Sequence, residues 1–110
     1  MTGAFEDREK AYEDKWAHDQ ALRFKVAARR NKLVGLWAAG ELGLSGEPAE
    51  AYAKTVIAAD LKGGGDADVF KKIRADFDAA KVAHSDHVLH RKLEELLAIA
   101  RDQVMNPPKI

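Results

Sequence analysis

The stretch from residue 85 to residue 104, SDHVLHRKLEELLAIARDQV, decides the fold class. Its apolar residues recur every three or four positions, as they do on one face of an α-helix. They are Leu89, Leu93, Leu96, Leu97, Ala100 and Val104. Ser85 is placed to cap the start of this helix. The helix cannot continue through Asn106, Pro107 and Pro108, because proline lacks a backbone N–H and clashes with the preceding turn.

Three more helices are expected before this stretch, with glycine and proline marking their ends. The first runs from about residue 19 to about residue 42, and the second from the sequence SGEP at residues 45–48 to about residue 62. Three glycines at 63–65 end the second helix. The third begins at Asp66 or Asp68 and ends before a break at residues 81–84.

The first of these helices has an apolar face with glycines inside it. Its expected core positions are Phe24, Ala27, Ala28, Val34, Trp37, Ala38 and Leu42. Asp19 is the expected N-cap, and Gly43 is the expected left-handed residue at the C-terminal end. Gly35 and Gly40 lie inside the helix, where each costs roughly 1 kcal/mol relative to alanine. Close approach of a neighbouring helix beside Trp37 would offset that cost.

These patterns predict an all-α protein, a four-helix bundle with a flexible N-terminal arm. No run alternates apolar and polar residues as a half-buried strand does. A chain of 110 residues fits one domain. We divide it into a mobile arm at residues 1–18, a four-helix bundle at residues 19–106 and a tail at residues 107–110.

Composition excludes several classes of function. The formal net charge is +0, so bulk attraction to nucleic acid or to anionic lipid is not expected. The absence of cysteine removes disulfides and thiolate chemistry. No apolar run approaches the ~18 residues of a membrane span, and the N-terminus lacks a signal-peptide pattern. No team of catalytic residues is evident, so we expect neither an enzyme nor membrane insertion, and a cytoplasmic location.

The N-terminal arm is dense in charge yet carries three aromatic residues, Phe5, Tyr12 and Trp16. At 100° per residue they fall within a narrow sector of one helix face. Such a thin apolar stripe buries too little area to keep a helix folded unaided. One interpretation is that the first helix simply starts early, with the aromatics lying on the bundle. The other is an arm that folds when it enters a groove on a partner, with the aromatics as anchors.

Five strings resemble the zeta subunits of alphaproteobacterial F-type ATP synthases, in the same order and over nearly the whole chain. They are FEDREKAYEDKWAHD at 5–19, LRFKVAARRNKLVGLWAA at 22–39, AEAYAK at 49–54, DVFKKIRAD at 68–76 and RKLEELL at 91–97. Several ordered strings are far more specific than one short motif.

The resemblance implies a four-helix bundle whose mobile N-terminal arm inhibits the enzyme. The partner would be the catalytic head of the F-type ATP synthase, which the inhibitor stops from hydrolysing ATP. The arm is implied to enter the interface between a catalytic and a noncatalytic subunit and to block rotation in the hydrolysis direction. The expected contacts are Phe5, Arg8, Tyr12 and Trp16. The resemblance also implies a protein peripheral to the membrane-bound ATP synthase, and we expect a monomer when it is free.

Charge is unevenly distributed near the first helix. Residues 1–20 hold six acids and three bases, whereas residues 21–35 hold five bases and no acid. One face of the first helix carries Lys25, Arg29 and Lys32. Three interpretations of this face are open: a solvated surface, a contact for phosphate or nucleotide, and a contact for an acidic patch on the ATP synthase head. The nucleotide hypothesis places ATP or ADP at Arg29, Arg30 and Lys32, with no other cofactor.

Two further hypotheses remain open. A bundle that senses nucleotide could act on a different protein partner, and a plain helical interaction module is the third class. His84, His87 and His90 recur every three residues, and the last two could share a metal at helical spacing. Ordinary exposed side chains or mild pH sensing are the alternatives, and we expect no metal site.

Overall fold

The computed structural model describes the backbone of residues 3–60 and 66–107, and the side chains from residue 17 onward within those ranges. Four α-helices are present there: α1 (Gly3–Glu41), α2 (Gly46–Ala59), α3 (Asp66–Ala79) and α4 (Asp86–Met105). The described residues contain no β-strand. The all-α fold class is therefore confirmed. The last three residues of the expected tail lie outside the described ranges.

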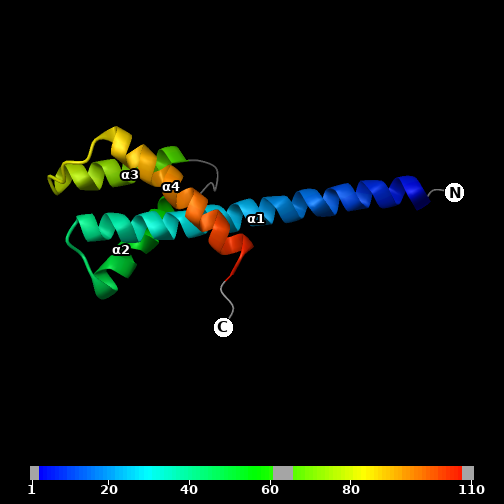
Figure 1. Cartoon of the computed structure of the whole chain (residues 1–110), viewed down its shortest axis with the longest axis horizontal. Coiled ribbons are helices and arrows are strands. Elements are labelled where there is room, and N and C mark those ends of the chain that lie inside the picture. The colour runs from blue at the N-terminus through cyan, green and yellow to red at the C-terminus, as the bar shows by residue number, and fades with distance from the viewer. Residues whose placement is uncertain (1–2, 61–65, 108–110) are drawn as a thin grey trace.

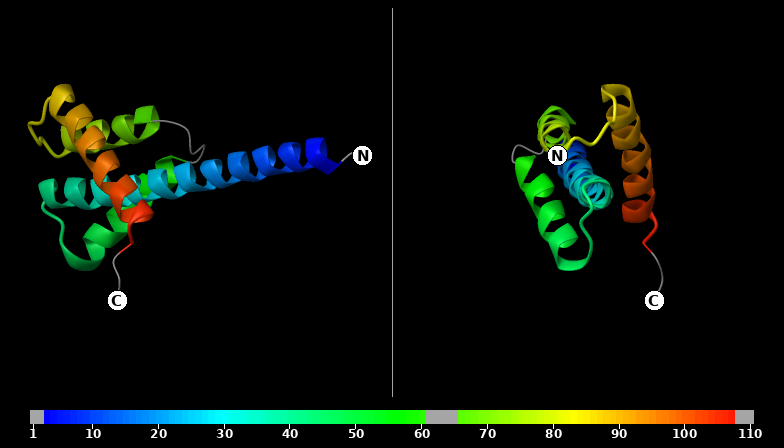
Figure 2. Two further views of the ribbon diagram at one scale, coloured as in Figure 1. Left: turned by 45° about the vertical axis from the view of Figure 1, so that its right-hand side comes forward. Right: turned by 90° about the vertical axis from the view of Figure 1, so that its left-hand side faces the viewer.

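Helix α1 is the central element of the bundle. It packs most extensively against α2 on one side and α4 on the other, while α3 packs against α2 and α4 (Figure 1). The right-hand view in Figure 2 looks along α1 and shows α2 and α4 flanking it. Helix α3 lies beside the N-terminal end of α4. The helices have unequal lengths, from 14 residues in α2 and α3 to 39 in α1. The bundle is consequently irregular.

One continuous apolar core joins the four helices. Its fully buried members are Val34, Ala38, Val56, Val69, Ile73, Phe77, Leu89 and Leu93. Each helix contributes at least one of them, at the spacing of three or four residues that the sequence predicts. The predicted cap of α4 is present as well, since Ser85 Oγ accepts a hydrogen bond of 3.2 Å from the N–H of Val88. Core and cap together fix where α4 begins and which face it buries.

The start of α1 differs from the sequence-based expectation. Asp19 was expected to cap the first helix, but α1 begins at Gly3 and passes through Asp19 without a break. The chain has neither glycine nor proline between Gly3 and Gly35, so nothing forces a stop. Extending an existing helix costs much less free energy than nucleating a new one. The proposed boundary between residues 18 and 19 therefore falls within a helix, and the division into arm and bundle stays a prediction.

The glycines near the end of α1 have three different roles. Gly35 faces α2 so closely that an added Cβ would lie 2.7 Å from Cα of Ala53, which confirms the expected close helix approach at this glycine. The same expectation is wrong for Gly40, which has open space around it. Gly43 adopts φ of 82°, and its neighbour Leu44 donates to Ala39 O over 2.8 Å. This is the glycine-terminated helix end that the sequence predicts.

Phe24 was expected in the core, and that prediction is wrong. Its side chain is 64% exposed, the largest exposed fraction among the large apolar residues of the described part. Ile57, on the expected apolar face of α2, is also exposed. The reason is that α2 ends at Ala59, close to Ile57, so no further turn of α2 covers Phe24. Both residues have the helical spacing of core positions, but no helix packs against them to bury their side chains.

Candidate functional site

The N-terminal part of α1 projects from the bundle. Figure 1 shows it standing clear of α2, α3 and α4. Residues 17–21 are all exposed, Leu22 is half-buried, and Val26 is the first buried residue among the described side chains of the helix. From Gly3 to Ala21 this unsupported length is about 28 Å at the rise of an α-helix. The helix therefore presents a rod whose sides are free to contact another molecule.

The predicted contacts Phe5, Arg8, Tyr12 and Trp16 belong to this projecting part. All four lie within the helical range of α1, but their side chains lie outside the described residues. Their role as contacts stays a prediction. The five residues that directly follow Trp16, residues 17–21, are all exposed.

At the inner end of the rod, two adjacent polar residues are buried. Arg30 is 3% exposed and Asn31 is 2% exposed. Arg30 donates from Nε to Oδ1 of Asn31 over 2.8 Å and forms an ion pair with Asp66, the first residue of α3. Asn31 donates from Nδ2 to Oδ2 of Asp60, the C-cap residue of α2, over 2.9 Å. The pair thus holds both ends of the connection between α2 and α3.

Burial of these groups is tolerated because their hydrogen-bonding capacity is used. A buried guanidinium without partners would cost several kcal/mol. No buried side-chain nitrogen or oxygen within the described ranges is left without a partner. Sequence reasoning placed Arg30 in a nucleotide site and missed its buried role. A signal did exist: Arg30 and Asn31 stand four and three residues before Val34, on the apolar face itself.

The three residues of the nucleotide hypothesis do not converge. Arg29 is exposed and donates from Nε to Oε1 of Gln103 on α4 over 2.7 Å. Arg30 turns to the opposite side, toward Asp66 on α3, and Lys32 is exposed. A phosphate at Arg30 would have to compete with the carboxylate of Asp66. Nucleotide binding at these residues stays a prediction.

The three histidines also diverge. His84 Nε2 lies 3.0 Å from Glu41 Oε2, and its ring packs against Trp37 and Phe77. His90 stacks on Phe70 with ring centroids 4.3 Å apart, whereas His87 is exposed. No three metal-binding side chains come together anywhere in residues 17–60 and 66–107.

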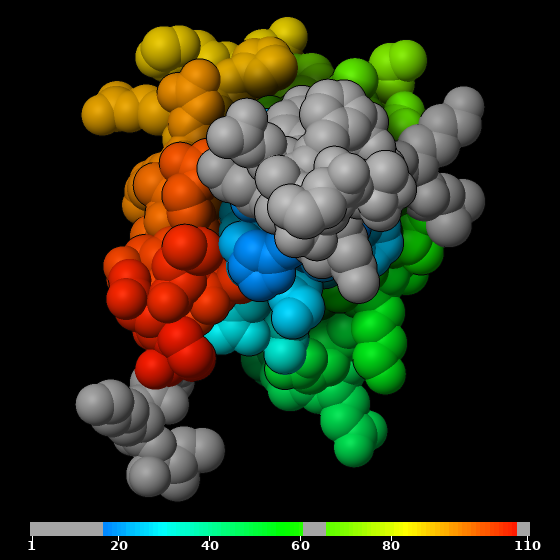
Figure 3. Space-filling model, turned by 90° about the vertical axis from the view of Figure 1, so that its right-hand side faces the viewer, coloured from blue at the N-terminus to red at the C-terminus, as the bar shows by residue number. Residues whose placement is uncertain are grey.

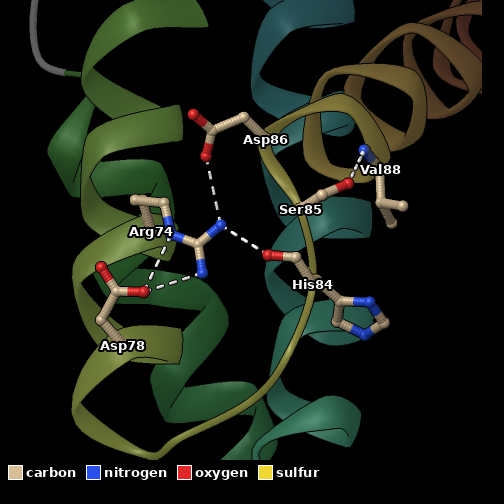
Figure 4. A network of polar contacts seen from close by, with 6 residues as sticks. All are labelled: Arg74, Asp78, His84, Ser85, Asp86 and Val88. Atoms are coloured by element: carbon tan, nitrogen blue, oxygen red, sulfur yellow. Dashed lines mark hydrogen bonds and ion pairs between the residues drawn. The ribbon is translucent and has the colours of Figure 1, made fainter.

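The loop that carries His84 is fixed by Arg74 of α3. Its guanidinium donates to the carbonyl oxygen of His84 over 2.6 Å and to the carboxylates of Asp78 and Asp86 (Figure 4). The hydrogen bond to Asp78 is the main cause that raises the Arg74 pKa. Since the arginine ties the end of α3 to the start of α4, we assign these contacts to the scaffold.

The fold and the projecting rod define a class: a small all-helical protein in which one long helix extends beyond the bundle (Figure 1). The chain belongs to the family of the ATPase inhibitor subunit zeta, whose sequence model matches residues 1–103. The family is that of an inhibitor subunit, so the role is regulatory and the ATPase is its target. None of the described helices is long and apolar enough to span a membrane.

A solved structure supports the same fold. It is described as a solution NMR structure, is 41% identical to this chain, and superposes with a TM-score of 0.69. The match covers 79% of this chain and 99% of that chain. Among curated proteins no significant match is found.

Proposed function

We propose that this protein inhibits ATP hydrolysis by the F-type ATP synthase through insertion of its N-terminal arm into an interface of the catalytic head. The arm is residues 1–18, with Phe5, Arg8, Tyr12 and Trp16 as contacts. The protein acts at the cytoplasmic side, bound peripherally to the membrane-embedded enzyme, and is a monomer when free. Family membership supports the target, and the projecting part of α1 supports the element.

The unbroken helix is the single observation that carries this proposal. Because α1 runs from Gly3 into the core without a break, the arm is part of the same helix that packs in the bundle. A wedge of this kind needs no chemistry: it stabilises one rotary conformation of the head. The inhibitor can shift the equilibrium among the rotary conformations of the head only as far as its affinity for the wedged conformation exceeds its affinity for the others.

The test is an ATP hydrolysis assay on the cognate catalytic head, titrated with the full-length protein. Tyr12→Ala and Trp16→Ala should each raise the half-inhibitory concentration by roughly tenfold or more, as expected for anchoring aromatic residues. Deleting residues 1–17 should abolish inhibition. That deletion should leave the bundle folded, because residues 17–21 are exposed and no core residue of the described side chains precedes Val26.

Glu47→Ala provides the matched control, since this exposed residue lies at the start of α2, at the end of the bundle away from the arm (Figure 1). It should inhibit as the unaltered protein does. If the deletion variant still inhibits with an unchanged midpoint, the arm is not the inhibitory element.

A further inference from the structure

Two exposed apolar side chains form a small pocket beside the arm. Phe24 of α1 is 64% exposed and Ile57 of α2 is 36% exposed. They line a pocket of about 70 Å³, which we call the Phe24–Ile57 pocket. Its lining residues are Phe24, Ala27, Ala28, Asn31, Ile57 and Asp60. Most of these surfaces are apolar, and the Asn31 amide is already bonded to Asp60.

The position of the pocket ties it to the arm. Phe24 follows position 16 by eight residues, which is about 12 Å along the helix axis. Since α1 has no break, the pocket and the arm lie on one helix, and a partner that binds the arm lies close to the pocket. The space-filling view toward the N-terminal end shows α1 emerging between α2 and the C-terminal half of α4 (Figure 3). Whatever cleft receives the arm must bring its rim against this end of the bundle.

The size of the pocket limits what can occupy it. Pockets that bury cofactors and other small ligands usually enclose about 300–1,000 Å³. A space of about 70 Å³ has room for one aliphatic side chain and is too small for a nucleotide. Apolar side chains that fill such a pocket, next to exposed aromatic surface, are typical anchors of protein interfaces. The pocket therefore fits a protein surface.

Charge next to the pocket specifies that surface further. Lys25 adjoins Phe24 in sequence, and Lys32 lies one helical turn after Ala28. Both lysines are exposed, and no carboxylate of the described residues pairs with either. Complementary charge across an interface raises the association rate and selects the partner. The matching surface should carry carboxylates around the apolar side chain.

We propose that the Phe24–Ile57 pocket is a second contact between this inhibitor and the catalytic head. It receives one apolar side chain, flanked by carboxylates, from the rim of the interface that the arm enters. This inference rests on the proposed function, because it takes the catalytic head as the partner. The arm blocks rotation, and the pocket adds affinity and fixes how far the arm can enter.

The test uses the full-length double variant Phe24→Ser/Ile57→Ser, with direct binding to the catalytic head measured beside ATP hydrolysis. Both side chains are exposed, so the bundle should stay folded. The dissociation constant should rise roughly tenfold or more, as it does when anchoring side chains are truncated. Inhibition at saturation should be unchanged because the arm is intact. Val88→Ser, which alters a residue 38% exposed at the start of α4, is the control and should change neither.

Each outcome has one meaning. A double variant that binds like Val88→Ser overturns the inference, whether or not the protein inhibits. If the unaltered protein binds the head without inhibiting hydrolysis, the proposed function fails, and weaker binding of the double variant would still support the pocket as a contact. If the unaltered protein does not bind the head, both fail. If it dimerises in sedimentation experiments and the double variant does not, a second copy is the occupant and the inference is overturned.

A charge-reversal variant tests the carboxylates. Lys25→Glu/Lys32→Glu should weaken binding to the head roughly tenfold at low ionic strength and much less at high salt. Lys71→Glu reverses an exposed lysine on α3 and serves as the control. Equal binding by the two variants would overturn the acidic character assigned to the partner surface.

Discussion

Asn31, in the C-terminal half of α1, donates a hydrogen bond of 2.9 Å to the carboxylate of Asp60, the C-cap residue of α2. Its neighbour Arg30 holds Asp66, where α3 begins. One pair of adjacent residues on the central helix therefore fixes the end of one helix and the start of the next. The pair lies four and five residues beyond Val26, the first buried residue among the described side chains of α1.

Replacing Asn31 with alanine should destabilise the fold. The substitution leaves the Nε hydrogen of Arg30 without its acceptor and removes the donor to Asp60. An unsatisfied buried group typically costs about 1–3 kcal/mol. Urea denaturation followed by circular dichroism measures the free energy of unfolding. Lys32→Ala, at the adjacent exposed position, should change it by no more than about 0.5 kcal/mol. Equal effects of the two substitutions would show that the buried pair contributes little.

Two glycines of α1 should respond oppositely to alanine. At Gly35 the new Cβ would meet Cα of Ala53 at 2.7 Å, so α1 and α2 would have to move apart. Such overpacking costs about 1–3 kcal/mol. At Gly40 nothing lies within 4 Å of the new Cβ, and the gain in helix propensity should stabilise the protein by roughly 1 kcal/mol or less. Thermal unfolding of the two variants measures whether each substitution raises or lowers the stability of the protein. A stabilised Gly35→Ala variant would contradict the close helix approach.

These two glycines show what sequence can and cannot predict about the fold. Periodicity and breakers predict four helices and most of the core, because both depend on neighbours along the chain. Gly35 and Gly40 look alike in sequence, and only the path of α2 separates them. The same holds for Phe24, which has core spacing but no facing helix. Contacts between distant segments decide these positions, and one sequence does not specify them.

Some features of the candidate site can likewise be predicted from the sequence, and others cannot. The resemblance of five strings predicts the family and the inhibitory arm. It could not show that Arg30 is buried, since an arginine in a basic stretch usually lies at the surface. The Phe24–Ile57 pocket was likewise beyond sequence reasoning, because its two walls are 33 residues apart and meet only where α2 returns beside α1.

Lys81 offers a stabilising substitution. It adopts φ of 60°, a left-handed conformation that costs a residue with a Cβ about 1–2 kcal/mol. Glycine adopts it without strain but loses more entropy on folding, so Lys81→Gly should stabilise the protein by about 0.5–1 kcal/mol. Lys71→Gly, inside α3, should instead destabilise it by roughly 1 kcal/mol. Chemical denaturation of both variants gives the comparison, and a loss of stability on Lys81→Gly would contradict the strain argument.

Tyr52 should make the stability of the protein sensitive to alkaline pH. Its hydroxyl donates to Oδ2 of Asp76 over 2.7 Å and joins α2 to α3, while Lys72 lies 3.0 Å from the same oxygen. Burial, followed by the hydrogen bond and the charge of Asp76, raises the Tyr52 pKa above its ordinary value. A tyrosine with a raised pKa in the folded state stabilises fully below the unfolded value of about 10, and this contribution is lost as pH rises beyond it.

Tyr52→Phe separates this effect from general alkaline unfolding. At pH 7 the variant should be less stable by about 0.5–1.5 kcal/mol, the usual net contribution of a hydrogen bond. Between about pH 9.5 and 11, around the ordinary tyrosine pKa, the unaltered protein should lose stability more steeply, so the two free energies of unfolding converge. Lysines that contact neither Tyr52 nor Asp76 contribute equally to both proteins and cancel in the difference. Urea denaturation at each pH gives the two curves, and a constant separation between them would show that Tyr52 does not titrate against Asp76 as the structure requires.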